Sequence, residues 1–181
     1  SVVTSTPSPR SGSYCLKCYG NTNNVGYYAR KNFVFGSALT TVSGRFGMFP
    51  NTSQNYQHAI LELLDSAGAV QLRVTLTETD MKLTLYRGAG STLLATGTTA
   101  LTKDAWNAIR WKAVINDSTG RFELWVGATK DIDYSGDTCQ TANVNVASAN
   151  IGILVVGGAA WNVAHYYGFD DIAFNDNSGA N

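Results

Sequence analysis

The most constraining feature of the sequence is the stretch 106–127, WNAIRWKAVINDSTGRFELWVG, in which apolar and polar residues alternate on both sides of a polar turn. Side chains on a β-strand alternate between two faces, so this period of two predicts strands with one apolar face. Asn116, Asp117 and Gly120 favour the turn, because Asn and Asp bond their own backbone and Gly accepts a positive φ. The stretch therefore predicts a β-hairpin that packs one face against a core.

The two faces of this hairpin differ in chemistry. The predicted inner face is apolar and consists of Ile109, Trp111, Ala113, Ile115, Phe122, Leu124 and Val126. The predicted outer face includes a mixed charged and aromatic set: Arg110, Lys112, Glu123 and Trp125. These four residues do not form a combination typical of a catalytic site, and we interpret the outer face as a contact surface.

Other short apolar segments recur along the chain, with turn residues between them. Their ranges are 13–19, 41–49, 58–65, 69–77, 81–87, 92–96, 151–156 and 166–174. Regular short strands of this kind predict an all-β fold in which two antiparallel sheets form a sandwich. Residues 130–150 lack a clear period, which predicts a surface loop that crosses between the sheets.

Length and composition indicate one domain. The 181 residues suffice for one well-filled core, and 18 Gly with only 14% charged residues suit a sheet protein with many turns. We expect a polar leader over 1–12, a single β-sandwich domain over 13–175, and a tail over 176–181 that can lead into further segments.

Charge and hydropathy argue against two classes of partner. Thirteen basic residues balance thirteen acidic ones and form no basic cluster along the chain, so nucleic acid is not an expected partner. No apolar run is long enough to span a membrane, and the first residues lack the pattern of a secretory signal. We therefore expect neither nucleic acid nor a membrane as a partner.

The three cysteines point to ordinary packing. An odd number leaves at least one thiol unpaired, and Cys15 and Cys18 lie on opposite faces of one predicted strand. We interpret both, together with Cys139, as small buried or half-buried residues. Free thiols favour assembly in a reducing compartment.

Four segments together resemble the concanavalin A-like lectin/glucanase jelly roll in its laminin G-like form: RSGSYCLKC near the start, the meander 61–85, the hairpin 106–127 and the ending YYGFDDIAFNDNSG. The resemblance covers nearly the whole chain and implies a two-sheet antiparallel jelly-roll sandwich. The leader TPSPRSGSYCLK and the ending FDDIAFNDNSG are similar to laminin G-like domains of tailed-bacteriophage structural proteins. That similarity implies a virion protein, assembled in the host bacterial cytoplasm, that contacts copies of itself and other virion proteins on a capsid or tail.

If the chain were a glycosidase, the resemblance would imply a set of carboxylates spaced E-x-D-x-x-E on one strand. One acid would protonate the leaving oxygen while another attacks the sugar. The closest match begins at Glu78 and Asp80, but Leu83 stands where the third acid belongs. We expect Glu78 and Asp80 to be solvated turn residues.

A polysaccharide lyase needs a Tyr or His base beside a group that offsets the uronate charge. His165, Tyr166 and Tyr167 could supply the base, with Arg110 or Arg73 near the uronate. Nothing in their spacing demands that arrangement, and we predict that the protein is not an enzyme and has no catalytic residues.

Carboxylates gather in two places, which makes calcium the one cofactor to consider. Asp131 and Asp133 lie in the predicted loop, and Asp170 lies at the start of the last strand. Asp170 and Asp171 point to opposite faces of that strand, so at most one of them can join a single site. The competing interpretation, in which Asp170 accepts backbone N–H groups, leads us to predict no cofactor.

Carbohydrate sites combine exposed aromatic rings with polar and charged side chains. Two patches have this composition: Trp125 with Glu123, Arg110 and Lys112, and Trp161 and Asn162 with Tyr134. Packing or a subunit interface is the competing interpretation of both.

We thus predict a non-enzymatic virion structural or accessory module, oligomeric through an exposed sheet face or edge, that could also bind cell-surface glycans. The alternatives are an extracellular carbohydrate-binding module of a polysaccharide-active protein or adhesin, and then a glycoside hydrolase or polysaccharide lyase.

Overall fold

The computed structural model describes residues 2–3, 7–19, 29–51, 57–157 and 166–175. Across these ranges the chain forms strands and no helix. The strands are β1 (Val2–Val3), β2 (Cys15–Tyr19), β3 (Ala29–Leu39), β4 (Thr41–Asn51), β5 (Gln57–Leu64), β6 (Val70–Thr77), β7 (Lys82–Arg87), β8 (Thr92–Thr96), β9 (Asn107–Val114), β10 (Gly120–Val126), β11 (Thr129–Gly136), β12 (Val146–Gly157) and β13 (Tyr166–Asn175).

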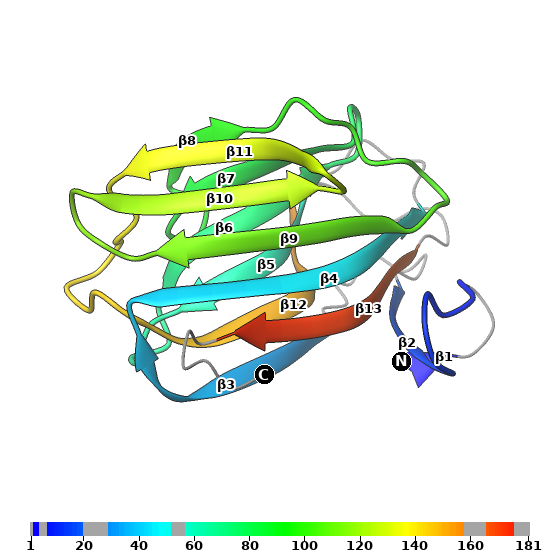
Figure 1. Ribbon diagram of the computed structural model, residues 1–181, viewed down its shortest axis with the longest axis horizontal. Coiled ribbons are helices and arrows are strands. Elements are labelled where there is room, and N and C mark those ends of the chain that lie inside the picture. The colour runs from blue at the N-terminus through cyan, green and yellow to red at the C-terminus, as the bar shows by residue number, and fades with distance from the viewer. Residues whose placement is uncertain (1, 4–6, 20–28, 52–56, 158–165, 176–181) are drawn as a thin grey trace.

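These strands form two antiparallel sheets that face each other, so the predicted all-β sandwich is confirmed. The seven-stranded sheet has the order β1-β2-β13-β4-β9-β10-β11, and the six-stranded sheet has the order β3-β12-β5-β6-β7-β8. In Figure 1 the strands from β11 down to β13 lie in front, and the six-stranded sheet lies behind them.

The predicted hairpin forms from β9 and β10, with Leu124 opposite Trp111 and Phe122 opposite Ala113. All four side chains are buried, and the rings of Trp111 and Phe122 stack with centroids 6.4 Å apart. Burial of large apolar side chains is the main favourable term in folding, so this inner face anchors one side of the core. The other sheet contributes a matching set: Leu61, Leu63, Leu72, Val74, Leu76, Leu83 and Leu85.

A buried polar cluster joins the two sheets and corrects one prediction. Glu78 is not a solvated turn residue, because only 7% of it is exposed. Its Oε1 lies 2.8 Å from Nε2 of His58 on β5 and accepts a hydrogen bond from the hydroxyl of Tyr167 on β13. The acid thus serves as a buried acceptor between the sheets, a role that a turn position in the sequence does not reveal.

The predicted loop 130–150 is wrong at both ends. Residues 129–136 form β11 at the edge of the seven-stranded sheet, and β12 begins at Val146. In β11 only Ile132 is fully buried while Asp133 and Ser135 are exposed, so this edge strand carries little apolar alternation. The strand β3 was not predicted, for a similar reason: it is an edge strand whose side chains are mostly exposed.

Part of the predicted leader packs on the sandwich. β1 pairs with β2, and Pro7 is buried. The backbone N–H groups of Arg10 and Ser11 donate to Oδ2 of Asp170 at 2.7 and 3.1 Å, as the backbone interpretation of this acid predicted. Cys15, Cys18 and Cys139 are all buried, and burial raises the pKa of Cys18 to about 11.

Candidate functional site

The outer face of the seven-stranded sheet carries two rows of side chains that cross the strands. Cross-strand pairing aligns Ala173, Arg45, Arg110, Trp125 and Lys130 in one row. A second row holds Asn175, Ser43, Lys112, Glu123 and Asp133. On β13, β4, β9 and β10, each member of this row lies two residues away from the member of the first row. The outer set predicted from the hairpin therefore occupies one continuous surface.

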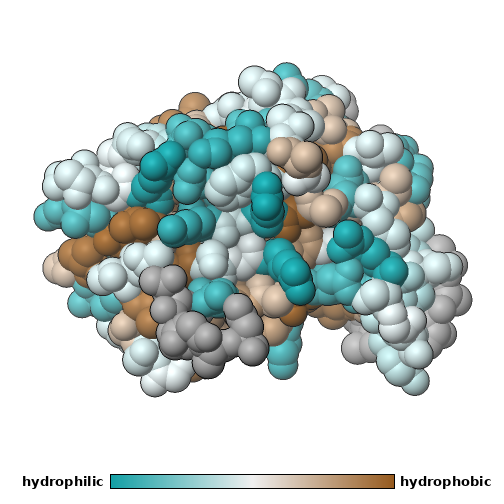
Figure 2. All heavy atoms as spheres, viewed as in Figure 1, coloured by the Kyte–Doolittle hydropathy of each residue, from teal (hydrophilic) through white to brown (hydrophobic). Residues whose placement is uncertain are grey.

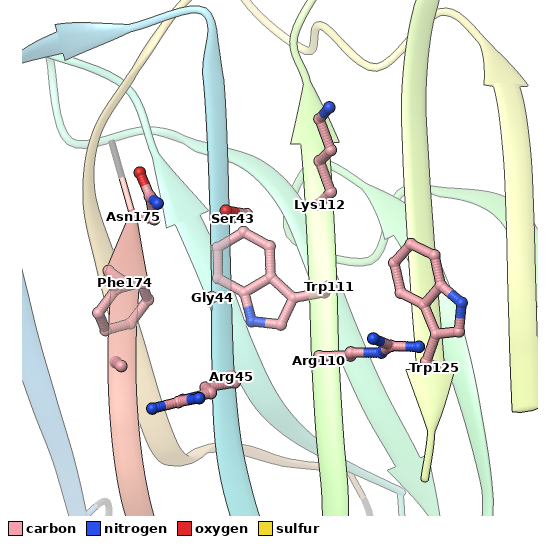
Figure 3. Close-up of a pocket in the computed structure, with 10 residues that line it drawn as sticks. Ser43, Gly44, Arg45, Arg110, Trp111, Lys112, Trp125, Phe174 and Asn175 are labelled. Carbon is pink, nitrogen blue, oxygen red and sulfur yellow. The ribbon is translucent and has the colours of Figure 1, made fainter. Parts of the chain in front are cut away.

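Trp125 stands between two cations. The guanidinium carbon of Arg110 lies 4.9 Å from the centroid of the Trp125 ring, and Nζ of Lys130 lies 5.2 Å from it. Each contact lies within the range of a cation–π attraction, which orients the indole ring. Figure 3 shows Arg110 reaching towards Trp125, while Arg45 extends the other way towards β13.

Beside this ring the surface is hollowed. One cavity of about 540 Å³ lies over β13, β4, β9 and β10 and is lined by Ser43, Gly44, Arg45, Arg110, Trp111, Lys112, Trp125, Ala173, Phe174 and Asn175. A second cavity of about 600 Å³ shares Arg45, Arg110 and Ala173 with the first and continues to Arg10 and Asp171. We call the two together the outer groove. In Figure 2 hydrophilic side chains gather on this face, with hydrophobic atoms visible between them.

Uncompensated positive charge distinguishes the outer groove. Arg45, Arg110 and Lys112 are exposed, and within the described ranges no carboxylate forms an ion pair with any of them. None of the described residues that line the first cavity is acidic. The groove therefore presents three cations that form no ion pair with a described carboxylate, while Asp171 in its second cavity pairs with Arg10.

The neighbouring strands β10 and β11 behave differently, because their charges neutralise one another. Arg121 lies 3.0 Å from both Glu123 and Asp133, while Nζ of Lys130 lies 2.5 Å from Glu123 and 3.2 Å from Asp133. Hydrogen bonds to Glu123 and Asp133 raise the pKa of Lys130. The hydrogen bond from Lys130, followed by that from Arg121, lowers the pKa of Asp133. Both groups are therefore held in their charged forms.

Sequence reasoning placed Trp125, Glu123, Arg110 and Lys112 on one outer surface but missed Arg45. Its signal was present, since Arg45 is the only cation in the predicted strand 41–49 and lies on the face opposite Phe46. What the sequence of one hairpin does not disclose is that β4 pairs with β9, which sets Arg45 directly opposite Arg110.

Of the second predicted patch, Tyr134 alone lies within the described residues. Tyr134 lies on β11 opposite Phe122 of β10 and packs against the core. Its hydroxyl donates a hydrogen bond to the carbonyl oxygen of Asp137 at 3.3 Å. Trp161 and Asn162 lie outside the described residues, as does His165 of the lyase alternative.

The aspartates considered for calcium bond protein groups at separate places. Oδ1 of Asp131 accepts the backbone N–H groups of Thr98 and Thr99 at 2.8 and 2.7 Å, and Asp133 belongs to the ion-pair network. In the described part of the chain no three His, Cys, Asp or Glu residues gather as metal ligands. These residues form no calcium site with one another.

The last strand corrects one geometric expectation. Asp170 and Asp171 do not serve opposite sides, because both bond the Arg10–Ser11 segment: Nη1 of Arg10 lies 2.7 Å from Oδ2 of Asp171. The pairing of β13 with β4 shifts register between Asp170 and Ala173, and Asp171 has a φ of 52°. This bulge breaks the alternation that the prediction assumed.

The comparisons with known proteins bear on the fold. No protein-family model matches the sequence, and the search of curated proteins finds no match. Among solved structures, the chain is similar to the cellulose-induced protein Cip1, with 18% identity, 97% of this chain and 84% of that chain covered, and a TM-score of 0.68. The alginate lyase Aly36B, solved as a mutant in complex with alginate trisaccharide, gives 12% identity, 90% and 83% coverage and a TM-score of 0.66. A tetrameric galectin from the ball sponge Cinachyrella sp. gives 11% identity, 81% and 99% coverage and a TM-score of 0.54.

These likenesses span lyases and lectins that share one architecture. At such low identity they define the fold and not the activity. Together with the strand topology they establish a two-sheet antiparallel jelly-roll sandwich. No helix in the described part of the chain could cross a membrane.

Proposed function

We propose that this chain is a non-catalytic β-sandwich that binds glycans in the outer groove. The observation that supports this most directly is Trp125, a partly buried indole at the wall of a cavity that also holds Ser43, Lys112 and Arg110. Sugar rings offer apolar faces to an indole and hydroxyl groups to polar side chains, so this combination suits them.

The same lining supports a binding role without catalysis. General acid–base chemistry needs a group that exchanges a proton with the substrate. The described lining of the outer groove includes one carboxylate, Asp171, which Arg10 holds in an ion pair, one exposed amine, Lys112, and no His, Tyr or Cys. Tyr167, a candidate of the lyase alternative, is fully buried and bonds Glu78.

A glycan array tests the binding proposal. We expect the chain to bind at least one class of oligosaccharide and Trp125→Ala to abolish that binding. Tyr14→Ala is the matched control, because Tyr14 is an aromatic residue that is 63% exposed and lines neither cavity. Array binding that persists in the Trp125→Ala protein would overturn the proposed function.

We further propose that the module works on a bacteriophage particle, in contact with copies of itself and with other virion proteins. The support for this setting is the sequence resemblance of the leader and of the ending FDDIAFNDNSG. An antibody against the chain should detect it in purified particles, and its mass in solution should exceed that of one chain. A monomer that never enters particles contradicts the setting but leaves glycan binding intact.

A further inference from the structure

The pairing of β4 with β9 sets two arginines directly opposite each other in register. Arg45 and Arg110 are direct cross-strand partners on the outer face. Side chains at such positions begin about 5 Å apart, and like charges placed there destabilise an antiparallel sheet. An acidic neighbour normally offsets such repulsion, yet no described carboxylate pairs with either residue.

The acids of this face are committed elsewhere. Glu123 and Asp133 bond Arg121 and Lys130, so this ion-pair network on β10 and β11 contains two charges of each sign. Lys112 is opposite Glu123 in register, but the ion pairs of Glu123 run to β10 and β11 instead. The positive charge of the groove is therefore left for something outside the described chain.

From this arrangement we infer that the outer groove selects anionic glycans, whose carboxylate or sulfate groups pair with Arg45, Arg110 and Lys112. The inference rests on the proposed function and adds the charge class of its ligand. Guanidinium groups bind carboxylate and sulfate oxygens through paired, charge-assisted hydrogen bonds, which suits both kinds of anion.

The layout of the cations defines the ligand further. Lys112 lies two residues beyond Arg110 on β9, or roughly 7 Å along the strand, while Arg45 lies one strand away, at about 5 Å. An anion bound by the arginines leaves Lys112 for a second anion. This spacing fits an oligosaccharide that repeats its charge, and Trp125, next to Arg110 in the same row, contacts a sugar ring of that ligand.

Calorimetric titration with three oligosaccharides of equal length tests the inference: a neutral cello-oligosaccharide, an alginate oligosaccharide and a sulfated heparin oligosaccharide. We expect at least one anionic ligand to bind about tenfold or more tightly than the neutral one, with an affinity that falls as salt is added. Binding of either anionic ligand supports the inference, and the stronger one identifies the anion.

Matched variants locate the effect. Arg45→Gln and Arg110→Gln should each weaken the anionic ligand about tenfold, a larger loss than either variant causes for the neutral ligand. Arg121→Gln is the control, because it also removes one exposed arginine from this face, within the neutralised network. It should change the affinity for the anionic ligand by less than about twofold, since exposed charges outside the groove are screened.

The failures are distinguishable. Equal binding of neutral and anionic ligands that Trp125→Ala abolishes overturns the inference and keeps the proposed function. No binding of any oligosaccharide overturns the proposed function itself. A single-stranded oligonucleotide that binds as tightly, with the same dependence on Arg45 and Arg110, shows that the groove takes phosphate polyanions and overturns the choice of a glycan.

Discussion

Arg73, on the outer face of one sheet, and the pair Arg45 and Arg110, on the outer face of the other, differ in whether they have a carboxylate partner. On the six-stranded sheet, Arg73 is largely buried, and its Nε and Nη2 donate to Oε1 of Glu62 at 2.9 and 2.6 Å. On the seven-stranded sheet, Arg45 and Arg110 are exposed and lack a described carboxylate partner. Arg73 holds two strands of its sheet together, while Arg45 and Arg110 are available for a ligand.

The polar row around Arg73 shows what an internally satisfied face looks like. Asn32 donates to Oδ1 of Asn150 at 2.8 Å, and Asn150 in turn donates to Oε2 of Glu62 at 3.4 Å. These residues bridge β3, β12, β5 and β6, and Asn150 and Glu62 are nearly inaccessible to solvent. Buried polar groups that bond one another stabilise the sheet and have little capacity left for a ligand.

The largest expected effect comes from breaking the buried ion pair. Glu62→Gln should lower the free energy of unfolding by about 3 kcal/mol, because it leaves the Arg73 guanidinium buried without its counterion. Urea denaturation followed by fluorescence measures this loss. A variant as stable as the wild-type protein would mean that the two outer faces do not differ as described.

The next largest effect concerns binding. Trp125→Ala should reduce glycan affinity by more than about 1 kcal/mol, since buried tryptophans dominate many binding surfaces. The free energy of unfolding should fall by no more than about 0.5–1 kcal/mol, the size of the lost contact with Arg110. A loss of stability as large as that of Glu62→Gln would instead make Trp125 a structural residue.

A smaller effect of opposite sign is expected from the groove cations. Arg45→Gln removes the like-charge pair with Arg110, so the unfolding free energy should rise by about 0.2–1 kcal/mol at low salt. The gain should shrink as salt screens the repulsion. A destabilised Arg45→Gln protein would show that this arginine supports the fold, against the contrast drawn between the faces.

The smallest effect concerns the exposed network on β10 and β11. The pKa of Asp133 is lowered in the folded state, so its contribution to stability is present above the unfolded-state pKa and is lost as the pH falls through the folded-state pKa. Asp133→Asn should therefore melt slightly below the wild-type protein at neutral pH and at the same temperature in acid. Thermal scans across that range measure the difference, and a constant gap at all pH values is the contrary result.

The local alternation of apolar and polar residues sufficed to predict the fold class and the groove residues that lie on the hairpin. The alternation in 106–127 predicts both faces of β9 and β10 because each face depends only on residues within the hairpin. Arg45 entered the groove through a long-range pairing that local periodicity does not encode, and β3 and β11 escaped detection as exposed edge strands. Glu78 was misplaced for the same reason: its partners His58 and Tyr167 come from distant strands.

The bulge in β13 has a practical consequence. It directs Asp170 and Asp171 onto Arg10 and Ser11, and Arg10 and Asp171 both form part of the wall of the second cavity. The Arg10–Ser11 segment is thus hydrogen-bonded to the last strand and forms part of the binding surface. Cleavage by a protease just after Ser11, or a recombinant protein that begins after Ser11, would open one end of the groove and leave the hydrophobic core intact. Ligand affinity would then fall more than the free energy of unfolding.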